Sequence, residues 1–275
     1  MQTRLINFVL RHEHLFKWMV FVRRPVLLKL ADFQIYVRLD DWAVGAKIAV
    51  KRNYEVHVSS FMGSLLRPGQ VVVDVGANIG YYTLLAASRI GDTGKVIAFE
   101  PGNDNCLLLK MSLQANHFKN VEIHMYAVID KEETVGFNIG GGSSNGGIGS
   151  IETATHRIEG IALDTFLGTE PRIDIIKMDI EGAEGRALQG MKQLIQRHRP
   201  IIFTEFSPHG LESRSNLSAE AYLEQLFDLG YDLFVLDRKT GKSRESQSIE
   251  QIMGCFAGEA SDHLDLVAYP KTKVV

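Results

Sequence analysis

The stretch VVVDVGANIGYYT, residues 71–83, decides the fold class of this chain. An apolar run around Asp74 is typical of a buried strand, glycines at positions 76 and 80 indicate a turn, and a helical pattern begins at Ile79. In open α/β sheets, a strand, a glycine-containing turn and a helix in this order hold a small ligand at the carboxyl end of the strand. The rest of the sequence then indicates which ligand this is.

Segments typical of strands and helices alternate along most of the chain. Besides 71–76, strands are predicted at 95–101, 121–128, 173–180, 200–206, 231–237 and 265–269, and helices at 79–91, 103–116, 182–198 and 218–230. This alternation predicts a parallel sheet covered on both faces, and right-handed crossovers make it doubly wound. We therefore expect an α/β fold with a mostly parallel, seven-stranded sheet.

Residues 1–69 are predicted to form an N-terminal extension, and residues 70–275 the ligand-binding domain. The extension contains a helical pattern within its first 30 residues, short strands at 33–40 and 47–52, and a helix at 55–69. Residues 1–30 carry six Lys or Arg against one Glu, about +5, and so leave about −8 for the rest. Two interpretations of this basic segment stay open: peripheral contact with an anionic membrane, or packing over the site or in a homodimer.

The composition is that of an ordinary globular protein, with 45% hydrophobic and 23% charged residues in a chain of 275. A net charge of −3 argues against nucleic acid as a partner, because proteins that bind phosphate backbones are usually basic. Two distant cysteines, Cys106 and Cys255, indicate reduced thiols. The early apolar runs are too short to span a membrane, and no cleavage site follows them. We expect a cytoplasmic protein, with peripheral membrane contact as the alternative.

Acidic residues stand at or just after the ends of four predicted strands: Asp74, Glu100, Asp179 and Glu205. The carboxyl ends of parallel strands meet at one edge of a sheet, which is where ligands bind. Four carboxylates at one edge repel each other unless a cationic or hydroxyl-rich ligand lies among them. The pattern therefore predicts a ligand with such groups.

The turn distinguishes this ligand from a dinucleotide, whose fingerprint is G-x-G-x-x-G. Asn78 stands where the second glycine belongs and hinders a close approach to a pyrophosphate, and Asp74 adds a negative charge nearby. Glu100, 20 residues after Gly80, is placed to accept hydrogen bonds from two ribose hydroxyls. These features favour S-adenosylmethionine, and an NAD-dependent oxidoreductase is the weaker alternative.

At this point the sequence resembles a known family. The motifs DVGANIGYYT (74–83), AFEP (98–101) and KMDIEGAE (177–184) are similar to those of the FkbM-type class I methyltransferases, and the resemblance covers roughly residues 48–206. It implies a Rossmann-like fold that binds S-adenosylmethionine and releases S-adenosylhomocysteine. The turn would hold the methionine end, Glu100 and its neighbour Pro101 the ribose, strand residues the adenine, and Asp179 the centre of the site. The cofactor-binding residues that this implies are Asp74, Gly76, Ala77, Asn78, Gly80, Glu100, Pro101, Ala127, Val128 and Asp179.

The family resemblance also implies an acceptor, a hydroxyl group on a sugar or another small natural product. An alcohol needs its proton removed as the new bond forms, and the candidates for this role are Asp179, Glu181, Glu205 and His209. A divalent metal held by Asp179 and Glu205 is an alternative route, although no metal-ligand spacing is present. A non-catalytic module that keeps the cofactor site is the alternative to an enzyme.

One segment interrupts the alternation. Residues 135–150 hold seven glycines, which predicts a loop or a hairpin with a long glycine-rich tip. A solvated insertion and a mobile lid beside the site both fit this composition.

Overall fold

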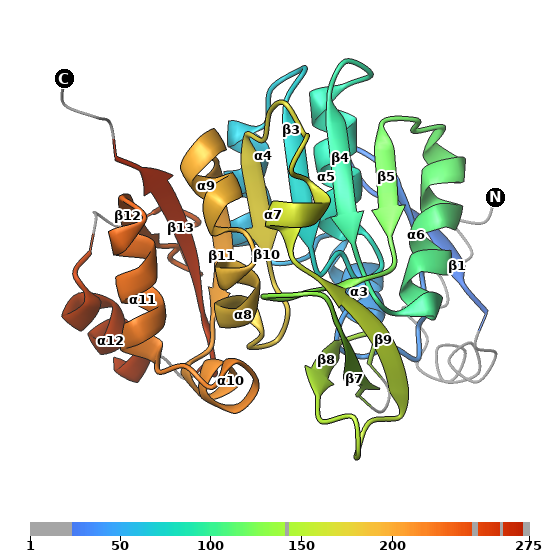
Figure 1. The fold of residues 1–275 in the computed structure, drawn as a ribbon. Helices are drawn as coiled ribbons and strands as arrows, with labels where there is room; N and C mark the ends of the chain where they lie inside the picture. Colours follow the sequence, from blue (N-terminus) through green and yellow to red (C-terminus); the bar gives the residue numbers. More distant parts are fainter. Residues whose placement is uncertain (1–23, 141–142, 244–246, 259–260, 272–275) are drawn as a thin grey trace.

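Figure 1 shows the computed structural model, which describes residues 24–140, 143–243, 247–258 and 261–271. Its centre is a seven-stranded sheet in the order β12-β13-β11-β10-β3-β4-β5. Every pairing in it is parallel except those of β13 with β11 and β12. The predicted α/β class with a mostly parallel, seven-stranded sheet is therefore confirmed. The strands are β3 (Val71–Val75), β4 (Lys95–Phe99), β5 (Val121–His124), β10 (Ile175–Met178), β11 (Ile201–Phe206), β12 (Tyr231–Val235) and β13 (Leu264–Pro270).

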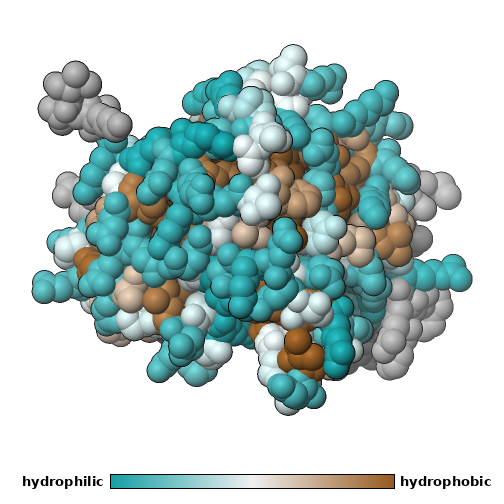
Figure 2. Space-filling view, in the orientation of Figure 1, coloured by the Kyte–Doolittle hydropathy of each residue, from teal (hydrophilic) through white to brown (hydrophobic). Residues whose placement is uncertain are grey.

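Helices cover both faces of this sheet (Figure 1), and the sheet separates the interior into two hydrophobic cores. Hydrophilic side chains cover most of the face seen in Figure 2, as expected when the apolar ones pack inside. The first core lies under α4 (Val56–Leu65), α5 (Tyr81–Ile90) and α6 (Asn103–Asn116). The second lies under α7 (Leu163–Phe166), α8 (Glu184–Gln189), α9 (Lys192–His198), α11 (Ala219–Asp228) and α12 (Ile249–Gly258).

Alternation along the strands decides which core each side chain enters. On β3, Val72 belongs to the first core, whereas Val73 and Val75 belong to the second. Successive residues of a strand point to opposite faces, so Asp74 shares the face of Val72, beneath α5. This assignment matters for the site described below.

The glycine-rich segment forms part of a second, four-stranded sheet in the order β6-β9-β7-β8. Its strands are β6 (Ala127–Val128), β7 (Glu133–Ile139), β8 (Gly146–Gly149) and β9 (His156–Ile161), and β7 and β8 form a hairpin. This sheet lies below the carboxyl ends of β4 and β5 in Figure 1. The prediction of one strand over 121–128 is wrong, because the chain leaves the main sheet after His124 and β6 pairs with β9 instead of β4.

The described part of the extension contains β1 (Val26–Lys29), β2 (Gln34–Val37) and α3 (Gly45–Lys51). The strand predicted at 47–52 is wrong. Asp41 accepts hydrogen bonds from the backbone N–H groups of Val44 and Gly45, which begins a helical turn. Ile48 is then fully buried while Val50 is 64% exposed, although the two would share a face in a strand.

The extension and the main sheet share the first core. Side chains of β2, α3 and α4 pack in it beside those of β3 and α5. Packing therefore crosses the predicted boundary at residue 69, and the division into two parts stays a prediction. The basic helix and the membrane contact were predicted within residues 1–30, of which residues 1–23 lie outside the described residues and Val26–Lys29 form β1.

The helix predicted at 182–198 is two helices, α8 and α9, separated at Gly190. A Cβ atom on Gly190 would lie 2.0 Å from the carbonyl oxygen of Ile129, so the backbone approaches the second sheet closely at this point. Within the described ranges, no helix is long and apolar enough to cross a membrane. The cytoplasmic location stays a prediction.

Candidate active site

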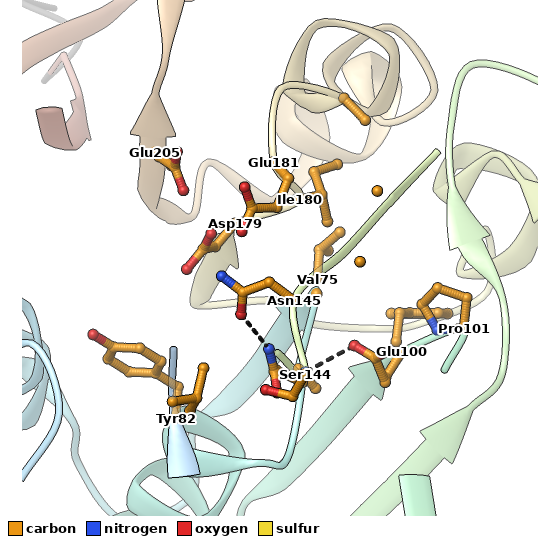
Figure 3. Close-up of a pocket in the computed structure, with 18 of the residues that line it drawn as sticks. Val75, Tyr82, Glu100, Pro101, Ser144, Asn145, Asp179, Ile180, Glu181 and Glu205 are labelled. Carbon is orange, nitrogen blue, oxygen red and sulfur yellow. Dashed lines mark hydrogen bonds between the residues drawn. The ribbon is translucent and has the colours of Figure 1, made fainter. Parts of the chain in front are cut away.

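The carboxyl ends of β3, β4, β10 and β11 border a cavity of about 320 Å³, a volume typical of sites for small molecules. Figure 3 shows its walls: Glu100 and Pro101 lie on one side, Glu205 and Asp179 on the other, and Asn145 lies between them. The cavity thus occupies the edge of the sheet at which the sequence predicts a ligand.

The turn after β3 forms the floor of the cavity. The backbone N–H groups of Gly76 and Ala77 both donate to the carbonyl oxygen of Phe99, at 2.9 and 3.0 Å. Gly76 has a φ of +83°, and a Cβ atom there would lie 2.0 Å from the carbonyl oxygen of Asp179. Only glycine lets this turn approach the end of β10 so closely. Gly80, also predicted for the site, packs against Leu109 instead and does not line the cavity.

Glu100 stands at the end of β4 and is 5% exposed. Its carboxyl oxygens accept hydrogen bonds from the backbone N–H groups of Asn78 and Gly102, both at 2.8 Å, and from the side chain of Asn105 at 3.1 Å. Burial raises its pKa from 4.5 to about 7, although these hydrogen bonds oppose the shift. The group is therefore held in place facing the cavity.

An apolar wall continues from Glu100. Ala127 and Val128 of β6 line the cavity and are 6% and 3% exposed. Phe99 lies beside them and contacts Phe166 edge to face, with 5.6 Å between the ring centroids. This wall suits a flat, uncharged ring.

The structure does not bring Asp74 to the cavity. Its side chain is 1% exposed, and its Oδ2 accepts a hydrogen bond from the Thr83 hydroxyl of α5 at 2.5 Å. Register explains the difference: Asp74 pairs with Lys177, two residues before Asp179, so it lies one level deeper in the sheet. Burial raises the pKa of Asp74. A direct contact between Asp74 and a ligand would therefore require rearrangement of α5.

Asp179 and Glu205 face each other at the opposite wall (Figure 3). Parallel pairing of β10 with β11 sets Met178 opposite Thr204, so the residues that follow them reach the same level. Both side chains line the cavity. Burial and then the charge of Asp179 raise the pKa of Glu205 well above its ordinary value. Burial opposes ionisation of Asp179, but the charge of Lys177 outweighs it and lowers the Asp179 pKa.

The two other predicted catalytic residues lie differently. Glu181 lines the cavity in a left-handed conformation, with a φ of +59°, and burial raises its pKa. His209 stands on the short helix α10 (Pro208–Gly210), where its side chain is exposed and does not line the cavity. Its assignment as a base is therefore not supported by its position.

Sequence reasoning missed several cavity residues that carry polar groups, among them Tyr82, Glu55, His263 and Lys177. Tyr82 donates from its hydroxyl to Glu55 at 2.7 Å, and Glu55 lies just before α4, far from the motifs. His263 places Nδ1 3.9 Å from Glu205 Oε1. Only Lys177 had a local signal, because it lies two residues before Asp179 in a strand and so shares its face.

The end of the β7–β8 hairpin lies over the turn. Asn145 accepts a hydrogen bond from the Asn78 side chain at 3.0 Å (Figure 3), and the carbonyl oxygen of Ser144 accepts one from Asn105 at 2.9 Å. Asp41, before α3, accepts from the Ser144 backbone N–H at 3.1 Å. The hairpin is thus a wall of the cavity, and its movement as a lid stays a prediction.

The alternative of a metal ion held by Asp179 and Glu205 depends on how the acidic side chains and their neighbours are arranged. Within the ranges that the structure describes, no group of three or more His, Cys, Asp or Glu side chains is arranged to hold one. Asp179 Oδ2 already accepts a hydrogen bond from the Lys177 ammonium group at 2.8 Å.

Comparison with known proteins supplies the family. The sequence model described as the methyltransferase FkbM domain matches residues 74–233. The chain belongs to the FkbM methyltransferase family. The resemblance carried by its three motifs is thereby confirmed, and S-adenosylmethionine is the cofactor that this family and this fold support.

Solved structures with a similar fold include three methyltransferases, all of low identity. An FkbM methyltransferase from Methylobacillus flagellatus KT is 17% identical, with 96% of this chain and 60% of that chain covered and a TM-score of 0.49. An S-adenosylmethionine-dependent O-methyltransferase from Thermotoga maritima is 12% identical, with 83% of this chain and 72% of that chain covered and a TM-score of 0.46. Fibrillarin of Aeropyrum pernix with natively bound S-adenosyl-L-methionine is 9% identical, with 77% of this chain and 73% of that chain covered and a TM-score of 0.45. The chain spans less than two thirds of the first of these proteins. A search of the curated proteins found no match.

Proposed function

We propose that this FkbM-family protein methylates a hydroxyl group of a small acceptor, a sugar or another hydroxylated natural product. The observation that carries the proposal is the pair of acidic residues at the ends of β10 and β11, Asp179 and Glu205, which face the same cavity as Glu100 and the glycine turn. One wall then suits a nucleoside and the other suits an alcohol. A net charge of −3 supports a small acceptor over nucleic acid.

The residues present fit the cofactor. Glu100 offers carboxyl oxygens to the two ribose hydroxyls, and the apolar wall of Ala127 and Val128 suits the adenine. Gly76 lets the turn lie against the end of β10, and Asp179 there offers an anion to the amino group of the methionine end. When bound there, S-adenosylmethionine supplies an activated methyl group.

The acidic wall provides the proton chemistry that an alcohol acceptor needs. Asp179 is ionised and accepts hydrogen bonds, so it orients an acceptor hydroxyl by accepting from it. Glu205 has a raised pKa, because burial and the charge of Asp179 oppose its ionisation and so favour uptake of a proton. His263 and the 94%-exposed Asp262 extend this wall from Glu205 to the solvent. Glu205 is therefore our candidate for the base.

The first test is isothermal titration with S-adenosylmethionine, S-adenosylhomocysteine and NAD. We expect micromolar binding of the two adenosyl ligands and none of NAD. An acceptor screen that measures S-adenosylhomocysteine release then follows, with sugars and other polyols compared with RNA. Release with a polyol that is lost in Glu205→Gln supports the proposal. Binding without turnover on any acceptor would favour the non-catalytic alternative, and release with RNA alone would overturn the choice of a small acceptor.

A further inference from the structure

Asn145, near the end of the β7–β8 hairpin, presents its side-chain amide to the cavity in one defined orientation. The backbone N–H of Ile79 donates to Asn78 Oδ1 at 2.7 Å, so the nitrogen end of the Asn78 amide is left as a donor. Asn78 Nδ2 donates in turn to Asn145 Oδ1 at 3.0 Å. The Nδ2 end of Asn145 is therefore the end that faces away from the turn, toward the wall of Asp179 (Figure 3).

This nitrogen is a fixed donor that the protein does not use. Within the residues that the structure describes, Asn145 Nδ2 has no hydrogen-bond partner, although the residue lines the cavity. The Asn145 backbone is held, because its N–H donates to Ser143 Oγ at 2.9 Å and its carbonyl oxygen accepts from the Gly140 N–H at 3.0 Å. A held donor without a partner in a cavity is placed to bind an oxygen atom of a ligand.

The glycine turn, by contrast, has already spent its own donors. The backbone N–H groups of residues 76–80 are all occupied within the protein: two donate to the carbonyl oxygen of Phe99, one to Glu100, one to the Asn78 side chain and one to the carbonyl oxygen of Ala77. An anionic group of a ligand that lies over this turn must therefore find its donor elsewhere.

We propose that Asn145 is a cofactor-binding residue, which donates from Nδ2 to the carboxylate at the methionine end of S-adenosylmethionine. The inference rests on the cofactor of the proposed function. Asn145 lies between Glu100, assigned to the ribose, and Asp179, assigned to the amino group (Figure 3). The methionine end crosses this region, and its carboxylate oxygens accept hydrogen bonds whereas its ammonium group cannot.

The position of this donor also fits the charges around it. Asp179 and Glu181 line the cavity nearby and would repel a second carboxylate that lacked a donor of its own. The hairpin that carries Asn145 is anchored beside the turn, because Ser144 bonds to Asp41 and Asn105 through its backbone. The glycine-rich segment thus supplies a specific contact to the cofactor.

The experiment is isothermal titration with two ligands: S-adenosylhomocysteine, and its decarboxylated analogue, in which a hydrogen atom replaces the carboxylate. We expect wild type to bind S-adenosylhomocysteine more tightly than the analogue. Asn145→Ala weakens S-adenosylhomocysteine binding by about three- to tenfold, and weakens binding of the analogue by less. Asn145→Asp still accepts from Asn78 but replaces the donor by a charge, so it lowers the affinity for S-adenosylhomocysteine further and spares the analogue.

Asn138→Ala is the matched control. Asn138 belongs to β7 of the same hairpin, and its side chain accepts from the Thr155 backbone N–H at 2.8 Å and does not line the cavity. We expect this variant to leave the ratio of the two affinities at its wild-type value, even if it loosens the hairpin.

Two outcomes would overturn the inference: equal binding of both ligands by wild type, or an equal loss for both ligands in the Asn145 variants. If Asn145→Ala does not fold by circular dichroism, Asn145→Asp, which keeps the hydrogen bond with Asn78, decides the question. These outcomes differ from a failure of the proposed function, in which wild type binds neither adenosyl ligand and the inference falls with it.

Discussion

Replacement of Glu100 by glutamine tests whether the ionised carboxylate of Glu100, which faces the cavity, destabilises the folded protein. In the ligand-free protein, Glu100 is a 5%-exposed carboxyl whose partners are two backbone N–H groups and the Asn105 side chain. No cation is among these partners. An anion in this environment destabilises the fold, and the glutamine variant removes the anion while it keeps the shape.

The magnitude follows from the pKa of Glu100, which burial raises from 4.5 to about 7. The shift of about 2.5 units corresponds to roughly 3 kcal/mol. Below pH 4.5, Glu100 is protonated in both states and contributes no pH dependence. Between pH 4.5 and about 7, the unfolded chain releases the proton and the folded protein keeps it, so the stability falls as the pH rises. Above about pH 7, the full cost remains.

Urea denaturation of wild type and Glu100→Gln at several pH values measures the contribution of Glu100 ionisation to the free energy of unfolding. The amide lacks one acceptor and costs stability at every pH, so the informative quantity is the change with pH. We expect the unfolding free energy of the variant, relative to wild type, to rise by roughly 3 kcal/mol from pH 4.5 to about pH 8. Glu224→Gln, on the exposed side of α11, is the control and shows no such rise. An equal difference at both ends of the pH range would refute the reasoning.

Three further predictions use binding and stability together. Gly76→Ala abolishes S-adenosylhomocysteine binding, because its Cβ atom meets the Asp179 carbonyl oxygen at 2.0 Å, whereas Gly63→Ala, which has open space on α4, leaves binding intact in the same titration. Leu226→Ala, in the second core, lowers the unfolding free energy by about 2–5 kcal/mol with unchanged affinity, as urea curves and titration will show. Asn145→Ala removes the hydrogen bond with Asn78 and weakens S-adenosylhomocysteine binding by about 0.5–1.5 kcal/mol, and an unchanged dissociation rate in stopped-flow measurements would count against it.

The main sheet could be predicted because its signals are local. The stretch 71–83 contains its own strand, turn and helix start, and the structure places β3 at Val71–Val75 and begins α5 at Tyr81. Buried parallel strands appear in a sequence as short apolar runs. The runs at 173–180 and 200–206 could therefore be predicted as strands, and they contain β10 and β11. Prediction from local sequence fails where one residue pattern is compatible with both a strand and a helix. Residues 47–52 alternate like a strand, but Asp41 starts a helix before them through two backbone hydrogen bonds.

Register explains which acidic residues reach the cavity. The sequence locates the end of a strand only to within a residue or two. A difference of two residues along a strand, however, decides whether a side chain reaches the cavity or lies deeper in the sheet. Asp74 lies within β3 and pairs with Lys177, while Asp179 follows the end of β10. The two carboxylates share a face but differ by one level, and α5 covers the deeper one through Thr83. Pairing between distant strands sets this difference, so the sequence of either strand alone does not contain it.

The two walls of the cavity therefore differ in how the chain encodes them. Gly76, Asn78 and Glu100 lie within 25 residues of one another and form one wall from a single strand-turn-helix-strand unit. The opposite wall joins Glu55 from before α4 and His263 from before β13 to the pair at the ends of β10 and β11. The acceptor wall proposed above is built from segments outside that unit, so we expect substitutions at Glu55 and His263 to alter acceptor choice before they alter cofactor affinity.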